Sequence, residues 1–276
     1  PQNIEGYPLI MQFLSGLIFG VSVAGIAWRL KALNTSGAVV ASLVGWIIWG
    51  LGGVPWAVVL LTFFISSSAL SRVSKKRKKG LHEKFSKGNR RDGAQVLANG
   101  GTASLLVVWM FFFPQNLWLW AAFLGAMATV NADTWATEIG VLNRRLPRLI
   151  TTGDLVETGT SGAISVTGTL ATICGAATIA LIGAFFSPQE SALDLMLAVT
   201  LGGVCGTFFD SLLGATVQAI YYCDACQKET EHYPLHTCSN ATLQQRGWSW
   251  LSNDWVNLFA SLVGAVSAAS IWVVST

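Results

Sequence analysis

Long apolar runs that alternate with short polar segments constrain this chain more than any other feature. The chain is 52% hydrophobic and only 11% charged, whereas a soluble domain carries about 25% charged residues. Helices of about 20 apolar residues cross a bilayer, and one run here is short enough to be re-entrant or to thin the bilayer locally. We therefore predict an all-α polytopic membrane bundle of about eight spans, at residues 9–30, 36–52, 54–72, 93–113, 116–141, 162–186, 192–222 and 254–274.

The distribution of positive charges supports this alternation of membrane spans with loops on opposite sides. If the amino terminus lies outside, the inside segments are residues 29–35, 72–92, 142–161 and 223–253, and all 17 Lys and Arg residues fall within them. Basic loops stay on the cytoplasmic side, so these segments and any site they carry are expected on the cytoplasmic or stromal face. The basic run at residues 75–79 is interpreted as an orientation signal and a contact for anionic lipid.

Two other functions of charged or terminal segments are disfavoured. The basic run has no aromatic interleaving and no binding motif, so nucleic acid is not an expected partner. The first apolar run lacks a cationic flank and a small-residue cleavage site, so it is read as a span rather than a signal peptide.

Residues 1–276 are expected to form a single integral membrane domain with an internal repeat. The two units are residues 93–141 and 162–222. In each unit, a span rich in small residues crosses the membrane from the inside, and a second span crosses back to an aspartate near the inside face. Gly125 precedes Asp133 by the same spacing that separates Gly202 from Asp210. Two spans per unit make the repeats parallel, so Asp133 and Asp210 could face each other. Chance similarity between small-residue helices is the alternative.

The fifth predicted span ends in two carboxylates and several small polar residues. Ionisable groups within a membrane segment are costly, so they indicate function unless they merely cap a helix end among lipid headgroups. At about 100° per residue, Asn131, Thr134 and Glu138 share a stripe, whereas Asp133 points elsewhere. A regular helix therefore does not place Asp133 and Glu138 side by side.

Further polar groups gather on the same face of the membrane. Close packing through glycine, or helix capping in the case of Asp254, is the alternative to a binding role. Small hydroxyl and glycine residues that open a helix suit anion binding by backbone N–H groups. The candidates are Arg90, Arg91, Asp92, Gln95 and Asn99 before the fourth span; Asp154, Thr158, Thr160, Ser161 and Ser165 before the sixth; Ser211 beside Asp210; and Asn253, Asp254 and Asn257 at the eighth.

The loop at residues 223–252 carries a separate cluster of cysteine and histidine. A Cys-x-x-Cys pair at Cys223 and Cys226 is followed by His236 and Cys238. These four ligands suit tetrahedral structural Zn²⁺, with His236 preferred over His232. Unliganded thiols or a redox pair are the alternatives.

Five ordered motifs resemble those of a family of integral membrane proteins. The family includes the phytyl-phosphate kinase of vitamin E biosynthesis and the transmembrane-protein-19-like proteins. The motifs are Arg91-Asp-x-x-Gln-Val-Leu-Ala-Asn-Gly, Asn131-Ala-Asp-Thr-Trp-Ala-Thr-Glu-Ile-Gly, Gly159-Thr-Ser-Gly-Ala-Ile-Ser, Asp210-Ser-x-x-Gly-Ala and Asn253-Asp-x-Val-Asn.

The resemblance implies phosphoryl transfer from a nucleoside triphosphate, with CTP as the favoured donor, to phytyl monophosphate or a related isoprenyl phosphate. The product, a prenyl diphosphate, serves tocopherol and phylloquinone synthesis. The membrane would be a bacterial or cyanobacterial inner membrane, a thylakoid or a chloroplast envelope.

The polar residues are assigned roles consistent with this chemistry. Asp133, Asp210 and Glu138 are expected to bind Mg²⁺, because carboxylates hold the magnesium that bridges phosphate oxygens. Arg91 is assigned to catalysis with them. Arg90 and the 158–165 segment would hold phosphates, and the amide side chains would orient them.

The sequence also fits other classes of function. A transporter or flippase for a phosphorylated lipid fits parallel repeats and intramembrane carboxylates, but the outer halves of the spans lack a polar path. A CTP-dependent lipid nucleotidyltransferase would use the same site, whereas the CDP-alcohol phosphotransferases are disfavoured because their Asp-Gly-x2-Ala-Arg signature is missing. The sequence does not decide whether the chain forms a homo-oligomer.

Overall fold

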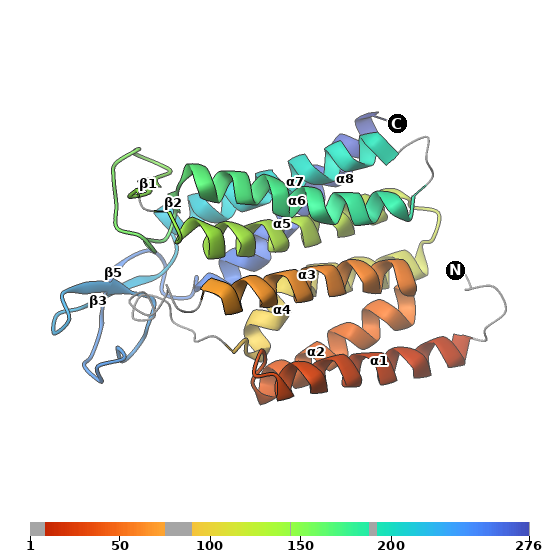
Figure 1. Cartoon of the computed structure of the whole chain (residues 1–276), viewed down its shortest axis with the longest axis horizontal. Helices are drawn as coiled ribbons and strands as arrows, with labels where there is room; N and C mark the ends of the chain where they lie inside the picture. The colour runs from red at the N-terminus through yellow and green to blue at the C-terminus, as the bar shows by residue number, and fades with distance from the viewer. Residues whose placement is uncertain (1–8, 75–89, 144, 188–191, 276) are drawn as a thin grey trace.

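The computed structural model describes residues 9–74, 90–143, 145–187 and 192–275. The basic run at residues 75–79 and Arg144 lie outside this part of the chain. Within it, long helices lie side by side along one axis (Figure 1). The helices are α1 (Leu9–Arg29), α2 (Thr35–Ile47), the π-helical turn η1 (Ile48–Gly52), α3 (Val54–Ser74), α4 (Gly93–Phe112), α5 (Trp118–Gly140), α6 (Val166–Phe185), α7 (Ala192–Thr216) and α8 (Asn253–Ser275).

The prediction of a polytopic helical bundle is confirmed. Seven of the helices in the described residues are long and apolar enough to cross a membrane, with α2 and η1 forming one of these segments. The eighth long helix, α5, does not meet the same criterion but lies in the middle of the bundle, in contact with α3, α4, α6, α7 and α8. Because its neighbours cover it, α5 can carry polar side chains that a lipid-facing helix could not.

Two predicted spans are longer than the helices that the structure contains. The apolar stretch that follows α7 was assigned to the seventh span, but Ile220–Cys223 form strand β3 of a small sheet. Residues 162–165 were assigned to the sixth span, but α6 begins only after Ser165, which caps it by accepting a hydrogen bond from the Gly168 N–H at 3.1 Å. Gly162 has φ +80°, a left-handed conformation that is incompatible with an α-helix at this position, so α6 cannot extend back to it.

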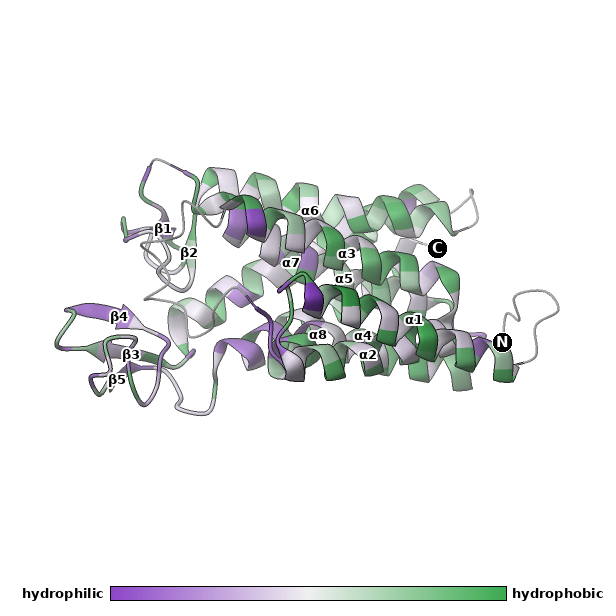
Figure 2. Cartoon of the chain, turned by 60° about the horizontal axis from the view of Figure 1, so that its bottom comes forward, coloured by the Kyte–Doolittle hydropathy of each residue, from purple (hydrophilic) through white to green (hydrophobic). Residues whose placement is uncertain are grey.

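Two small sheets lie at one end of the bundle. Strands β1 (Arg148–Leu149) and β2 (Ala163–Ile164) pair between α5 and α6. Strands β3, β4 (Lys228–Thr230) and β5 (Leu243–Arg246) form an antiparallel sheet in the order β4-β3-β5. Figure 2 shows that hydrophilic residues concentrate at this end, which we call the polar end.

The loops that carry the described basic residues all reach the polar end. The α1–α2 connection, the ends of α5 and α7 and the starts of α6 and α8 lie there, and the start of α1, the α4–α5 connection, the end of α6 and the start of α7 lie at the opposite end (Figure 1). This arrangement agrees with the alternation that the charges predict. Which side of the membrane the polar end faces stays a prediction.

Glycine contacts join α5 and α7 to the same part of α8. A Cβ added at Gly125 of α5 would overlap the Gly264 carbonyl oxygen and lie 2.5 Å from the Ala268 Cβ. A Cβ at Gly202 of α7 would meet the same two residues, at 2.9 Å and 2.7 Å. Gly125 and Gly202 hold equivalent places in the predicted repeat, so this shared contact supports the repeat, which itself stays a prediction.

Candidate functional site

A polar cavity opens at the polar end of the bundle, among α4, α5, α6, α7, α8 and the neighbouring loops. The cavity and its mouth hold about 1830 Å³ of empty space. Most of the residues singled out in the sequence line it, although they come from segments far apart in the chain. These are Arg91, Gln95, Asn99, Asp133, Thr134, Glu138, Thr158, Thr160, Ser161, Ser165, Asp210, Ser211, Asn253, Asp254 and Asn257.

The two repeat-related aspartates lie close together across this cavity. Asp210 interacts electrostatically with Asp133 and with a third carboxylate, Glu231. The Asp210 Oδ2 atom is buried and has no hydrogen-bond partner among the described residues. A buried carboxylate oxygen without a partner is costly, so the position suits a bound cation.

Close contact between α5 and α7 brings these aspartates together. One turn or more before each aspartate, Gly203 of α7 approaches Ala128 of α5, where an added Cβ would lie 2.8 Å from the alanine Cβ. Gly206 approaches Thr129 in the same way. Small residues let membrane helices approach this closely, so the polar ends of the two helices meet in the cavity.

Glu138 lies on a different side of α5 from Asp133, as the helical spacing predicts. Its carboxylate is buried against α3, where it accepts hydrogen bonds from the Ser71 hydroxyl at 2.7 Å and from the Ser74 hydroxyl. Arg91 interacts electrostatically with it. The carboxylate of Glu138 is thus already engaged by hydroxyl donors and a cation.

Arg91 is held at the edge of the cavity by its backbone and its ring contacts. Its N–H donates to the Ala32 carbonyl at 3.0 Å, and its own carbonyl accepts from the Asn34 N–H at 3.1 Å. Its guanidinium lies 5.3 Å from the Phe63 ring centroid. Burial lowers the pKa of Arg91 to about 10, opposed by the Glu138 carboxylate, so Arg91 remains cationic at neutral pH.

Four predicted site residues do not line the cavity. Asp92 caps α4 by accepting from the Gln95 N–H, with a reciprocal bond from its own N–H to the Gln95 side chain. Asn131 is fully buried. Its side chain donates to the Gly175 carbonyl at 2.8 Å and accepts from the Ser66 hydroxyl at 2.9 Å, so it links α5 to α6 and to α3. Arg90 and Asp154 are exposed. Direct contact of these four with a ligand in the cavity is not supported by their positions.

Glu231 is the most informative lining residue that the sequence did not single out. It lies between the predicted metal ligands Cys226 and His236, in a loop whose path no helical spacing could predict. The Gln218 side-chain Nε2 donates to the Glu231 carboxylate at 2.8 Å, and the Gln218 side-chain Oε1 accepts from the Ser161 hydroxyl at 2.9 Å. The Cys/His loop therefore contributes a carboxylate to the cavity.

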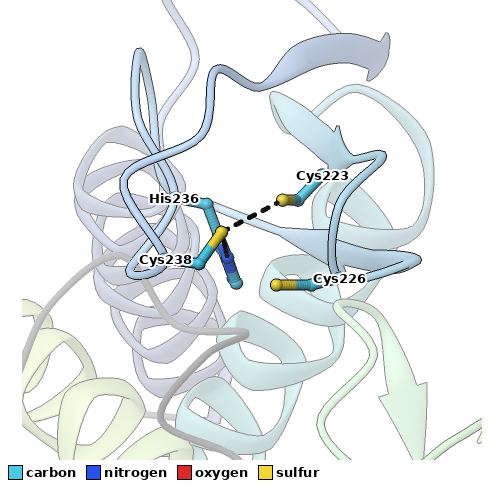
Figure 3. Close-up of side chains that lie close together, drawn as sticks. All are labelled: Cys223, Cys226, His236 and Cys238. Carbon is cyan, nitrogen blue, oxygen red and sulfur yellow. Dashed lines mark hydrogen bonds between the residues drawn. The ribbon is translucent and has the colours of Figure 1, made fainter.

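The predicted zinc ligands come together in that loop (Figure 3). The ligand atoms of Cys223, Cys226, His236 and Cys238 all lie within 4.8 Å of one another. The Cys223 and Cys238 sulfurs are 3.6 Å apart, close to the ~3.8 Å that tetrahedral coordination at about 2.3 Å implies. Hydrogen bonds, chiefly from Asn240, lower the pKa of the Cys238 thiol to about 5.

The donor set fits a metal better than it fits the alternatives. Three sulfurs and one imidazole match the Cys₃His set of structural zinc sites. The other histidine of the loop, His232, is outside the cluster, as predicted. Zinc itself stays a prediction.

A helical membrane bundle with a carboxylate-lined cavity at one end is the class that this fold and site define. The family model described as integral membrane protein DUF92 matches residues 18–265. The chain belongs to this family.

Curated relatives match along most of their length. Protein PGR of Arabidopsis thaliana is 32% identical over 93% of this chain and 97% of its own. An uncharacterized membrane protein of Methanocaldococcus jannaschii is 32% identical over 96% of this chain and 95% of its own. Protein VTE6, chloroplastic, also of Arabidopsis thaliana, is 24% identical over 90% of this chain and 68% of its own. No solved structure matches the chain significantly.

Proposed function

We propose that this protein is a membrane prenyl-phosphate kinase. It would transfer a phosphoryl group from a nucleoside triphosphate, with CTP as the favoured donor, to phytyl monophosphate or a related isoprenyl phosphate. The observation that carries the proposal is the approach of Asp133 and Asp210 across a polar cavity beside Arg91, in a bundle that otherwise faces lipid. The similarity to Protein VTE6 and the motif resemblance to the phytyl-phosphate kinase family support it.

Asp133 and Asp210 are the residues that we assign to Mg²⁺. The unpartnered Oδ2 of Asp210 and its electrostatic interaction with Asp133 fit a divalent cation held between the two carboxylates. A magnesium ion held by these residues would supply positive charge that offsets the charge of the nucleotide phosphates. Glu231 is near enough to add a third carboxylate.

The sequence predicts that Glu138 binds Mg²⁺, but its contacts in the structure favour a different role. With both carboxylate oxygens engaged by Ser71 and Ser74, Glu138 is suited to fix the orientation of Arg91. Arg91 then presents a charged, planar set of donors to a phosphate, a geometry that lysine cannot reproduce.

The remaining lining residues suit binding and alignment of the phosphates. The 158–165 segment lies at the amino-terminal end of α6, where backbone N–H groups and the helix dipole favour anions. Asn99, Asn253 and Asn257 add amide donors from two other helices.

The reaction needs little more than this alignment. A phosphate-monoester oxygen of the prenyl phosphate attacks the γ-phosphorus, the bond from γ-phosphorus to the β–γ bridging oxygen breaks, and the nucleoside diphosphate leaves. The attacking oxygen is already anionic near neutral pH, so no strong general base is required.

The Cys/His loop is assigned a structural role. We propose that Zn²⁺ bound to Cys223, Cys226, His236 and Cys238 fixes the loop and thereby places Glu231 at the cavity. We also propose that the polar end faces the cytoplasm or stroma, where the nucleotide is available, because the basic loops gather there.

The direct test supplies the purified protein with phytyl monophosphate, Mg²⁺ and each nucleoside triphosphate in turn. The proposal predicts phytyl diphosphate and a nucleoside diphosphate as products. A cytidylylated lipid with release of pyrophosphate would identify a nucleotidyltransferase instead. Absence of any product, together with movement of the lipid phosphate across a vesicle membrane, would favour a transporter.

A further inference from the structure

A second, apolar cavity lies beside the polar cavity, between α1, α2, α3 and α4. Its empty space, including the open solvent at its mouth, is about 620 Å³. Val23 of α1, Ala41 of α2 and Phe64 of α3 contribute to its wall. All of its lining residues are apolar or glycine except two.

Those two residues join the apolar cavity to the polar one. Arg91 and Asn99 line both cavities. The Arg91 guanidinium lies over the rings of Phe63 and Phe64, which line the apolar cavity, while its charge remains available to the polar cavity. A ligand that fills both cavities must therefore have an apolar body and an anionic head.

Few close contacts join α1 and α3 on one side of the apolar cavity. α1 packs along α2 and η1 and has no comparably extensive contact with α3. At the polar end a single described hydrogen bond, from the Arg72 guanidinium to the Leu30 carbonyl at 3.2 Å, links α3 to the end of α1. A chain dissolved in the membrane would enter most readily on this side, without passing through water.

We propose that the apolar cavity binds the isoprenoid chain of the acceptor and that Arg91 and Asn99 mark the point where the chain gives way to phosphate. This inference rests on the proposed kinase function, because it takes a prenyl monophosphate as the ligand. The apolar cavity meets the polar cavity at the Arg91 cation. This arrangement suits a lipid with a single chain and one anionic head. A two-chain phospholipid would leave its second chain without a place in the cavity.

Substitutions that fill the cavity test the proposal. Val23→Trp and Ala41→Phe place a ring in the space assigned to the chain. The matched control is Val21→Trp, two residues away on α1, where the side chain is 53% exposed and does not line the cavity. We expect both filling variants to raise KM for phytyl phosphate by about tenfold or more, with little change in kcat. Turnover of dimethylallyl phosphate, whose chain is too short to fill the cavity, should match the wild type and shows that the variants are folded.

A binding measurement separates this inference from the kinase proposal. A phytyl phosphate analogue with a diazirine at the chain end is photolysed with the wild-type protein, and the labelled peptides are identified. Labels on α1, α2 or α3 around Val23, Ala41 and Phe64, reduced by unlabelled phytyl phosphate and by Val23→Trp, support the tail site even if no diphosphate forms. Labels elsewhere, labels insensitive to Val23→Trp, or no labels would overturn it, whatever the result of the kinase assay. Equal competition by a two-chain phosphatidic acid would also contradict it.

Discussion

At the scale of single residues, Arg91 connects more parts of the molecule than any other site residue described above. Its backbone is bonded to the α1–α2 connection, its guanidinium lies over two phenylalanines of α3, and its charge interacts with Glu138 of α5. It also lines both cavities. A cation fixed from so many sides is preorganised for an anion, which lowers the cost of ordering it on binding.

Arg91→Lys is expected to lower kcat/KM for the acceptor by about tenfold or more, because lysine keeps the charge but loses the planar pair of donors and the ring contact. Steady-state kinetics with phytyl phosphate would measure this loss. Arg29→Lys, at the exposed end of α1, is the matched control and should behave as wild type. Equal kinetics for both variants would remove Arg91 from the site.

The sequence predicted part of the site at this scale and missed another part for a physical reason. Asp133 and Asp210 were predicted because helical periodicity and repeat spacing are local properties of the chain. Glu231 was not, because its position depends on how the Cys/His loop folds back onto the bundle. For Asn131 the motif suggested phosphate binding, whereas its side chain bonds to the Gly175 carbonyl and the Ser66 hydroxyl within the bundle.

At the scale of elements, the glycine contacts with α8 determine how closely α5 and α7 can each approach α8. Gly264 lies against Gly125 and Thr129 of α5 and also against Gly202 of α7. An added Cβ at this position would overlap the Thr129 hydroxyl, and relief of that overlap would move α8 away from α5, the helix that carries Asp133.

Gly264→Ala is expected to destabilise the bundle by about 1–3 kcal/mol through overpacking. The measurement is the melting temperature of the detergent-purified protein. Gly25→Ala in α1 is the matched control, because a Cβ there meets nothing within 4 Å. A lower melting temperature is expected for Gly264→Ala alone; the same temperature for both variants would show that this contact is not tight.

The Cys/His loop is the second element that can be tested by itself. The purified protein should contain about one zinc ion per chain by elemental analysis, and Cys223→Ser should lose it. Loss of zinc should also lower phosphoryl transfer, because Glu231 would no longer be held at the cavity. Cys205→Ser, an exposed position on α7, should retain both zinc and activity. Full activity of a zinc-free protein would contradict the link between the loop and the site.

At the scale of the whole molecule, the sequence predicted the bundle well because the bilayer restricts what an apolar chain can form. The errors lie where the chain leaves the hydrocarbon. Residues 217–222 are as apolar as a helix end, yet Ile220–Cys223 form a strand because β4 and β5 supply its hydrogen-bond partners. Hydropathy does not reveal that pairing.

Sidedness is a property of the whole molecule and can be measured without enzyme activity. In a bacterial host, alkaline phosphatase fused after Asn116, in the α4–α5 connection, should be active because that loop is expected outside. The same enzyme fused after Asn143, which follows α5 at the polar end, should be inactive. The reversed pattern would place the polar end, and the proposed site, on the outer face.

We propose that Asp133 and Asp210 together hold the magnesium used in phosphoryl transfer to a prenyl phosphate. The most direct measurement is diphosphate formation by Asp133→Asn and Asp210→Asn in detergent, with Asp194→Asn as the control because Asp194 lies in the first turn of α7, at the opposite end of that helix. Melting temperatures would verify that all three variants are folded. We expect both site variants to fall to background while Asp194→Asn turns over normally. Near-normal turnover by Asp133→Asn and Asp210→Asn would contradict the claim.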